Sequence, residues 1–256
     1  MFQFQTYLRY QIVAKGLHSI HSPFVFRLVT ECMRAKGQVA GEEQAEAWRK
    51  KLKKNKSAVC GIDYGSGQGM TMEYRVSDLT RKSLLPRKYC RLLSRLAHFS
   101  GAKIIIEMGT SLGVSTLYLA ASSEKTRVVT MEGNEGIAAE AERGFDQYLP
   151  GTIRLVNGDF NETLRPLMEQ SGTFDLAFID GNHFCRPTIE YFKLLKQYRH
   201  EKTVIVFDDI YHSSEMFDAW ELIKADTDVT ITIDLWRMGL VYFIPGMEKQ
   251  DFVVKY

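Results

Sequence analysis

Carboxylates end four apolar runs of this 256-residue chain, at positions that suit chemistry. They are Glu107, Glu132, Asp180 and Asp208, the last with Asp209 beside it. Ligands of open α/β sheets bind beyond the carboxyl ends of the strands, so we expect these acids to gather at one rim. Their mutual repulsion makes such a rim costly unless a cation or hydroxyl donors share it.

A strand, a glycine turn and a helix are predicted within Lys103–Ala120, which we take as the centre of the fold. The β-branched run of three isoleucines before Glu107 suits a strand buried on both faces. Gly109 and Gly113 frame a turn where backbone can approach a ligand closely. Ser111 and Ser115 are expected to cap the helix that follows. Such a unit opens nucleotide-binding α/β domains, although many strand-to-helix turns need glycine for steric reasons alone.

Strands and helices then alternate along the chain. The expected strands are Arg127–Glu132, Thr152–Val156, Phe174–Asp180, Thr203–Asp208, Val229–Leu235 and Leu240–Ile244, with a small edge strand at Phe252–Lys255. The expected helices are Leu84–Ser100, Ala138–Tyr148, Thr188–Tyr198 and Glu215–Lys224. This rhythm predicts an α/β fold whose mostly parallel sheet is covered on both faces. The last two strands are too close for a crossover, so they form an antiparallel hairpin.

The first hundred residues are interpreted as a helical extension with a lid loop, and residues 101–256 as the cofactor-binding domain. A second glycine cluster, Asp63–Gly69, competes with the first. Ala58–Cys60 before it is a poor strand, and Val76–Ser83 after it is too polar for a buried one. We therefore interpret residues 61–83 as a loop or lid over the site.

Composition argues against several classes of protein. The formal net charge of +2 gives no global argument for nucleic acid or membrane binding, so neither DNA nor a membrane is expected as a partner. No apolar run approaches the roughly 18 residues of a membrane span. The four cysteines are widely spaced without a Cys-x-x-Cys pair, and the N-terminus lacks signal-peptide character, which favours a cytoplasmic protein.

Glu132 ends its strand where a carboxylate accepts two hydrogen bonds from vicinal ribose hydroxyls. Dinucleotide and S-adenosylmethionine sites both use this device. Asp159 follows the third strand, where it either accepts from an adenine amino group or caps the next helix, and we weigh the two equally. Phe160 is placed to pack on the base.

Together the motifs resemble the class I S-adenosylmethionine-dependent methyltransferases, most closely a bacterial subgroup of the small-molecule O-methyltransferase branch. The motifs are Glu107–Gly113, Val129–Glu132, Phe174–His183 and Val204–Asp209, and the resemblance covers roughly residues 100–245. It implies a Rossmann-like three-layer α/β/α sandwich. The sheet would have seven mostly parallel strands with a reversed last strand, preceded by the helical extension.

The resemblance also implies residue roles. The cofactor set is Glu107, Gly109, Thr110, Ser111, Gly113, Ser115, Glu132, Gly133, Asp159, Phe160 and Asp180. Asp180, Asp208 and Asp209 match the positions that bind a divalent cation in catechol-type members, and these oxygen ligands suit Mg²⁺. That type has Asn at the position of Asp209 and a lysine base at that of His183, so the need for metal and the identity of the base both stay open.

The reaction that the resemblance implies is O-methylation of a small hydroxylated molecule. His183 titrates near neutral pH and is our candidate base, with Asp180 as the second catalytic candidate; a structural role for His183 is the alternative. Three other readings stay open: a methyltransferase for protein or RNA, a non-catalytic binding module on this scaffold, and a nicotinamide dehydrogenase. The dehydrogenase is disfavoured because the turn lacks Gly-x-Gly-x-x-Gly. A homodimer is one candidate assembly.

Overall fold

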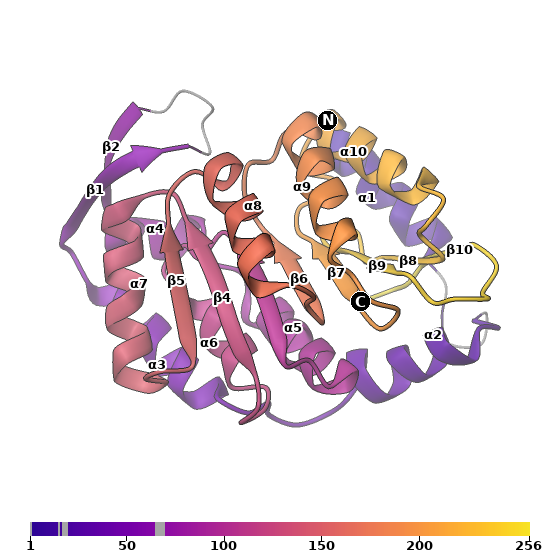
Figure 1. Ribbon diagram of the computed structural model, residues 1–256, viewed down its shortest axis with the longest axis horizontal. Helices are drawn as coiled ribbons and strands as arrows, with labels where there is room; N and C mark the ends of the chain where they lie inside the picture. Colours follow the sequence, from indigo (N-terminus) through magenta and orange to yellow (C-terminus); the bar gives the residue numbers. More distant parts are fainter. Residues whose placement is uncertain (1, 15, 17–19, 65–69) are drawn as a thin grey trace.

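A single large sheet forms the centre of the computed structural model, which describes residues 2–14, 16, 20–64 and 70–256 (Figure 1). Its strands are β3 (Ile104–Met108), β4 (Arg127–Glu132), β5 (Ile153–Asn157), β6 (Leu176–Ile179), β7 (Val204–Phe207), β8 (Ile231–Asp234), β9 (Gly239–Tyr242) and β10 (Gln250–Val253). Their spatial order is β10-β8-β9-β7-β6-β3-β4-β5. The predicted mostly parallel sheet is confirmed, and β9 is the reversed strand, antiparallel to β7 and β8.

The sheet has eight strands rather than seven, because β10 pairs in parallel with β8 at the edge. The chain after β9 turns back and places Gln250–Val253 beside Ile231–Asp234. This edge strand lies slightly earlier in the chain than the predicted 252–255. It extends the sheet on the side away from β3.

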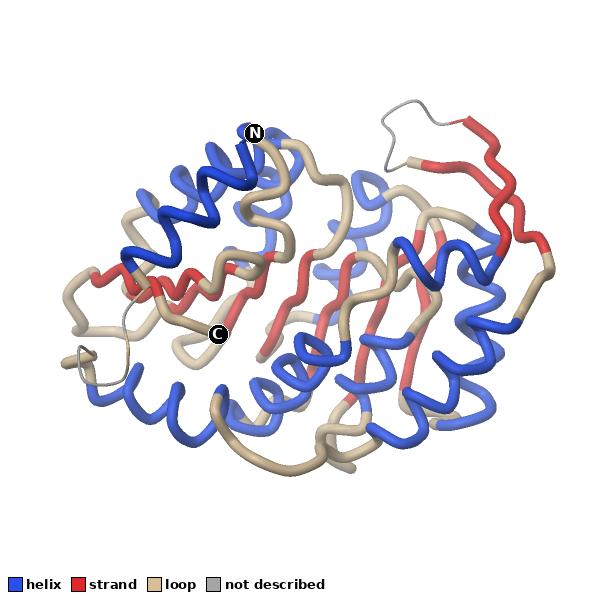
Figure 2. Tube along the Cα trace, turned by 180° about the vertical axis from the view of Figure 1, so that it is seen from behind, coloured by secondary structure: helices blue, strands red, loops and turns tan. Residues whose placement is uncertain are grey.

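Helices cover both faces, as expected. Helices α8 (Phe160–Ser171), α9 (Cys185–Gln197) and α10 (Ser214–Ala225) lie over the face seen in Figure 1. Helices α3 (Glu42–Lys54), α5 (Arg87–Ser100), α6 (Val114–Ala120) and α7 (Glu135–Tyr148) pack on the other, part of which Figure 2 shows from behind. Neighbouring residues of one strand enter opposite cores: Ile105 packs with α5 and α6, and Ile106 with α8 and α9. This double burial explains the continuous apolar runs in the sequence.

The N-terminal segment packs against the sheet domain. Helix α1 (Phe2–Val13) lies beside α10 (Figure 1), where the rings of Phe2 and Phe217 meet edge to face. Helix α2 (Pro23–Arg27) leads into the π-helix η2 (Leu28–Met33), whose buried residues join the same core as α5. Since this core is shared, the boundary at residue 100 stays a prediction.

The interpretation of residues 61–83 as a loop is wrong. Strands β1 (Ala58–Asp63) and β2 (Met70–Arg75) form an antiparallel hairpin, followed by helix α4 (Val76–Lys82). Gly65–Gly69 of the glycine cluster lie outside the described residues. The hairpin packs on α7, where a Cβ on Gly136 would lie 2.3 Å from the carbonyl oxygen of Cys60. The contact needs glycine because it brings backbone onto backbone.

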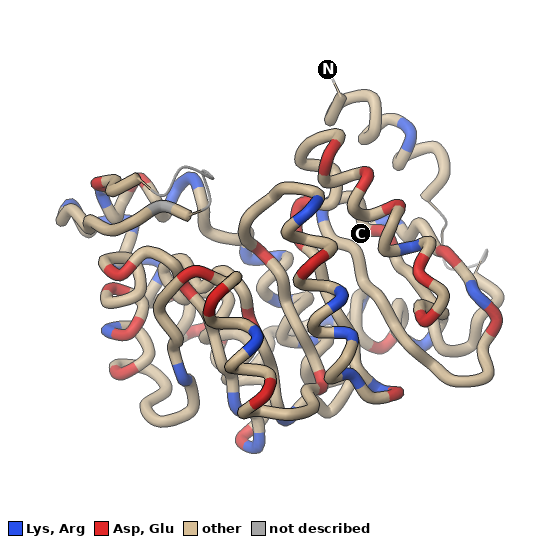
Figure 3. The backbone as a smooth tube through the Cα atoms, turned by 45° about the horizontal axis from the view of Figure 1, so that its top comes forward, with Lys and Arg blue, Asp and Glu red and all other residues tan. Residues whose placement is uncertain are grey.

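Charged residues of both signs lie interspersed along the helices seen in Figure 3. Among the described residues, we find no helix with the length and apolar character needed to cross a bilayer.

Candidate functional site

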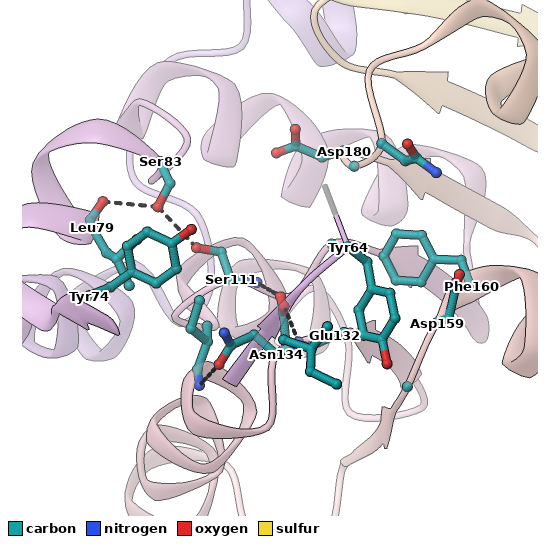
Figure 4. Close-up of a pocket in the computed structure, with 17 residues that line it drawn as sticks. Tyr64, Tyr74, Leu79, Ser83, Ser111, Glu132, Asn134, Asp159, Phe160 and Asp180 are labelled. Atoms are coloured by element: carbon teal, nitrogen blue, oxygen red, sulfur yellow. Dashed lines mark hydrogen bonds between the residues drawn. The ribbon is translucent and has the colours of Figure 1, made fainter. Parts of the chain in front are cut away.

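A pocket of about 280 Å³ opens at the carboxyl ends of β3, β4, β5 and β6 (Figure 4). The residues after these strands line one side of it, and the β1–β2 hairpin and α4 line the other. They include Gly109, Ser111, Glu132, Gly133, Asp159, Phe160, Asp180, Tyr64, Tyr74 and Ser83. The acids predicted to share one rim therefore do lie at the same edge of the sheet.

In the glycine turn after β3, the backbone packs where a side chain would otherwise lie. Gly109 has a φ of +102°, and a Cβ there would lie 1.9 Å from the carbonyl oxygen of Asp180. The amides of Gly109 and Thr110 both donate to the carbonyl oxygen of Met131, 3.0 Å away. The turn is thus fixed between β4 and the end of β6. This position leaves the pocket floor open.

The predicted serine caps are wrong. Gly113, left-handed at φ +77°, occupies the N-cap position of α6 without a side-chain cap, because Phe145 packs where its Cβ would lie. Ser111 lies within the turn, also at positive φ, and lines the pocket. The hydroxyl of Ser115 points back to Glu107 at 2.7 Å. The serines in this turn serve the pocket and the buried carboxylate instead of the helix end.

Glu107 is fully buried beneath this turn. Its carboxylate accepts hydrogen bonds from the hydroxyls of Ser115 at 2.7 Å, Thr116 at 2.5 Å and Thr130 at 2.7 Å. Burial raises the pKa of Glu107, and the three hydroxyl donors oppose that shift. Glu107 is not among the residues that line the pocket. It holds together the parts that form the pocket.

Glu132 presents a carboxylate at the centre of the pocket. The amide of Ser111 donates to one of its oxygens at 2.9 Å, and the amide of Asn134 donates to the other at 3.0 Å. Both carboxylate oxygens are therefore positioned by backbone amides, and a carboxylate oxygen can accept more than one hydrogen bond. This arrangement suits recognition of a pair of neighbouring hydroxyl groups.

Aromatic rings flank Glu132. Figure 4 shows Tyr64 and Phe160 on one side of it and Tyr74 with Ser83 on the other. The ring of Tyr64 lies against Gly133, where a Cβ would come within 2.6 Å of it. Planar apolar surfaces around a hydroxyl-binding carboxylate suit a nucleoside, whose base stacks on rings while its ribose is held by hydrogen bonds.

The side chain of Asn134 supplies an orphaned donor. Its Oδ1 accepts from the amide of Ile137 at 3.0 Å and caps α7, while its buried Nδ2 has no hydrogen-bond partner among the described residues. Buried amide donors rarely stay unpaired in native proteins. Because Asn134 also lines the pocket, this atom is a further feature that fits a polar ligand.

Asp208, which the sequence analysis assigned to a divalent cation, forms an ion pair with Arg237. Its side chain is 0% exposed, and both of its oxygens accept from Arg237, with Nε–Oδ1 at 2.9 Å and Nη2–Oδ2 at 2.6 Å. Arg237 also lies 3.5 Å from Asp209. One of the three carboxylates predicted to bind a cation, Asp208, is therefore held by a guanidinium in this arrangement, and the cation site of Asp180, Asp208 and Asp209 stays a prediction.

Two histidines, His183 and His212, lie beside Asp180 and Asp209 at the acidic rim. Asp180, His183 and Asp209 each bring one ligand atom within 4.8 Å of the others. The rings of His183 and His212 lie 5.5 Å apart. Burial lowers the pKa of His183, against the opposing charge of Asp209. Burial and the neighbouring Asp208 and Asp209 raise the pKa of Asp180, which shifts both groups toward their neutral forms.

A second pocket, also of about 280 Å³, adjoins the acidic rim. It is lined by Gln3, Asp209, Tyr211, His212, Trp236 and Arg237. Helix α1 closes part of this pocket, because Gln3 donates to the carbonyl oxygen of His212 at 2.9 Å. Asp180 lines the first pocket and Asp209 the second. Ligand atoms of these two carboxylates lie within 4.8 Å of each other, so the two pockets lie on either side of the acidic rim.

Residues 106–210 match a family model described as a methyltransferase domain. The catechol O-methyltransferase of Niastella koreensis is 31% identical over 131 residues, which are 50% of this chain and 58% of that protein. The chain spans about half the length of the curated relatives that it matches.

Solved methyltransferases share the fold. A methyltransferase of Podospora anserina bound to S-adenosylhomocysteine aligns with a TM-score of 0.62 and 15% identity, over 88% of this chain and 97% of that one. The O-methyltransferase of Bacillus cereus, also in complex with S-adenosylhomocysteine, aligns with a TM-score of 0.58 and 20% identity, over 86% of this chain and 97% of that one. The resemblance drawn from the sequence is confirmed for the fold and for the domain.

The first pocket brings together seven of the eleven residues predicted to bind cofactor. Those that line it are Gly109, Ser111, Glu132, Gly133, Asp159, Phe160 and Asp180; those that do not are Glu107, Thr110, Gly113 and Ser115. Thr110 and Gly113 belong to the turn itself, and Glu107 and Ser115 are hydrogen-bonded to each other beneath it. Asp159 also caps α8, accepting from the amide of Asn161 at 2.9 Å, so its two predicted roles are compatible.

Sequence reasoning missed Asn134 and Arg237. A signal for Arg237 was available: β8 runs in the same direction as β7, so the turn between β8 and β9 must lie at the rim that carries the site. A charged residue in that turn faces the strand-end acids. Tyr64 and Tyr74 belong to the segment that the sequence analysis placed over the site, and both line the pocket.

Proposed function

We propose that this protein is an S-adenosylmethionine-dependent O-methyltransferase that acts on a small hydroxylated molecule. The observation that carries the proposal is the Glu132 carboxylate, held at the end of β4 by two backbone amides between aromatic walls. The activities for which the relatives are named, catechol O-methyltransferase and O-methyltransferase, support the same reaction class.

The residues of the first pocket fit this cofactor. Glu132 would accept hydrogen bonds from the ribose hydroxyls, and Phe160 and Tyr64 would contact the adenine ring. Asp159 would accept from the adenine amino group. Gly109, which has no side chain to block the floor, would lie against the methionine portion. When bound, S-adenosylmethionine supplies a methyl group already activated by a sulfonium.

The residues of the acidic rim would position the acceptor and remove its proton. The imidazole of His183 is a suitable base, because burial lowers its pKa and keeps it neutral at physiological pH. Its Nε2 lies 3.8 Å from Oδ1 of Asp180. Asp180, whose pKa burial raises, accepts a proton more readily than an exposed carboxylate and would share the one taken by His183.

The acceptor would enter through the second pocket, since its Asp209 lies within 4.8 Å, ligand atom to ligand atom, of Asp180 in the first. Tyr211, Trp236 and His212 give this pocket aromatic walls with polar edges. Such walls suit a small aromatic or hydroxylated molecule, in line with the sequence-based expectation of a small-molecule acceptor.

Calorimetric titration with S-adenosylhomocysteine tests the proposal. We expect micromolar binding by the wild type and at least about tenfold weaker binding by Glu132→Ala, since a carboxylate that accepts two hydroxyl donors is removed. Glu169→Ala, an exposed change on α8, is the matched control and should bind as the wild type does. Absence of binding by the folded wild type would overturn the proposal.

A further inference from the structure

The guanidinium of Arg237 pairs with the buried carboxylate of Asp208, one of the positions to which the family resemblance assigns a divalent cation. Nε contacts both oxygens, at 2.9 and 3.1 Å, and Nη2 contacts Oδ2 at 2.6 Å. This is a forked arrangement in which a planar cation faces a planar carboxylate. We propose that Arg237 takes the place of the divalent cation, so that the site works without a bound metal.

The charges around Asp208 account for the pair. Three carboxylates, Asp180, Asp208 and Asp209, gather at the rim, and Asp208 is wholly shielded from water. A buried carboxylate without a partner is strongly destabilising. A divalent cation would have to displace these hydrogen bonds and would then lie beside the positive charge of the guanidinium. The ion pair and the metal are therefore alternatives at Asp208.

The backbone holds Arg237 in place. It lies in the turn between β8 and β9, where its amide donates to the carbonyl oxygen of Leu235 at 2.9 Å and its carbonyl oxygen accepts from Ile210 at 3.2 Å. The ring of Tyr89 lies 5.5 Å from its Cζ, within range of a cation–π contact. These contacts reduce the entropy that a freely moving surface arginine would lose on forming the pair.

The donors that remain, Asp180, His183 and Asp209, form the competing site for a metal. Asp209 lies 3.5 Å from Nη2 of Arg237, so a cation bound there would lie close to a fixed positive charge. Repulsion between like charges at short range weakens such binding. We therefore expect this trio also to stay free of metal while Arg237 is present.

The consequence for the reaction rests on the proposed function. Without a chelated cation, the site has no need of a vicinal diol, and a molecule with a single hydroxyl suffices. Its proton passes to His183 instead of being released by metal coordination. Arg237 acts as a positioning residue that balances the charge of the rim.

Titration with Mn²⁺, followed by loss of its free electron paramagnetic resonance signal, tests the proposal on the whole chain. For the wild type we expect no binding tighter than about 1 mM. Arg237→Ala frees Asp208 and should bind Mn²⁺ at least about tenfold more tightly. The double variant Arg237→Ala with Asp208→Asn should lose that gain, which assigns the new site to Asp208.

Two further variants serve as controls for the Mn²⁺ titration. Arg186→Ala removes an exposed arginine whose partner is Glu190 and should leave Mn²⁺ binding at the wild-type level. Arg237→Gln drops the charge but keeps hydrogen-bond donors, and serves if Arg237→Ala fails to fold. Stoichiometric binding of Mn²⁺ by the wild type overturns the proposal, whatever the variants do. The proposal is also overturned if a folded Arg237→Ala variant binds S-adenosylhomocysteine but binds Mn²⁺ as weakly as the wild type does.

The outcome can be read separately from the proposed function. Mn²⁺ binding is measured without the cofactor. Binding of S-adenosylhomocysteine does not depend on whether the acidic rim holds a metal. A wild type that binds neither would overturn the methyltransferase function while supporting the metal-free site.

Discussion

The hydroxyl of Thr130 on β4 donates to the carboxylate of Glu107 on β3 across 2.7 Å, in the protein interior. The hydroxyl of Thr110, in the glycine turn, lies 2.6 Å from that of Thr130 and extends the chain of hydrogen bonds. Because Ser115 and Thr116 bind the same carboxylate, Glu107 joins two strands, the turn and α6. The residue assigned to the cofactor by resemblance is thus placed to support the turn that lines the pocket.

Glu107→Gln should lower the free energy of unfolding by about 1–3 kcal/mol, because an amide group would face hydroxyl donors with one acceptor oxygen in place of two. Urea denaturation measures the change. Glu169→Gln, at an exposed position of α8, is the control and should unfold as the wild type does. Equal stability of the Glu107 variant would mean that the three hydroxyls find other partners at no cost.

The central sheet could be predicted because its residues are buried on both faces. The apolar runs of β3, β6 and β7 have no exposed side, so hydrophobicity alone marks them, and the acid after each run marks its carboxyl end. The hairpin could not be predicted in this way. Five of the six residues of β2 are exposed, so backbone pairing holds it without an apolar pattern for the sequence to show.

The site could be predicted as far as it depends on strand ends. Glu132, Asp159 and Asp180 lie where parallel strands must place them. The pairing of Asp208 with Arg237 depends on the path of a four-residue turn 29 positions away, which spacing in the sequence does not determine. The position of Tyr64 in the pocket depends on how the β1–β2 hairpin packs against α7. Both gaps come from contacts between distant segments.

Gly136→Ala should displace the β1–β2 hairpin. An added Cβ would lie 2.3 Å from the carbonyl oxygen of Cys60, which is backbone and cannot turn away, so β1 must move off α7. Tyr64 follows β1 and lines the pocket. We therefore expect several-fold weaker binding of S-adenosylhomocysteine by calorimetry and faster proteolysis within the hairpin.

Glu142→Ala is the control for this prediction, since it changes an exposed position of the same helix to the same residue. It should leave both readouts unchanged. Wild-type affinity and proteolysis in the Gly136 variant would show that the hairpin tolerates the added methyl group where it stands.

Asp159→Ser separates the two roles of Asp159. Serine is as good an N-cap as aspartate, so the free energy of unfolding should change by less than about 0.5 kcal/mol. Its shorter side chain would not reach the base, and we expect about tenfold weaker binding of S-adenosylhomocysteine. Asp159→Asn keeps both the cap and an acceptor oxygen and should bind more tightly than the serine variant. Wild-type affinity of Asp159→Ser would leave Asp159 as a helix cap alone.

Tyr10 fastens α1 to the end of the chain. Its hydroxyl donates to the carbonyl oxygen of Val254 at 2.8 Å and accepts from the amide of Tyr256 at 3.1 Å. Tyr10→Phe leaves both backbone groups without this partner and should lower the free energy of unfolding by about 1–2 kcal/mol. Tyr7→Phe is the control, because among the described residues no hydrogen bond to the Tyr7 hydroxyl is present, and the ring contact with Trp236 is kept.

The effect of Tyr10→Phe should be the same at pH 7 and pH 9. Burial raises the pKa of Tyr10 from its ordinary value of 10.0 to about 12, so the folded state disfavours the phenolate. A raised folded-state pKa gives a contribution that is complete below pH 10 and is lost as the pH rises through about 12. Urea denaturation of both proteins at the two pH values measures this. A difference that shrinks by pH 9 would contradict the raised pKa of Tyr10, because it would need the hydroxyl to ionise below even its ordinary value of 10.0.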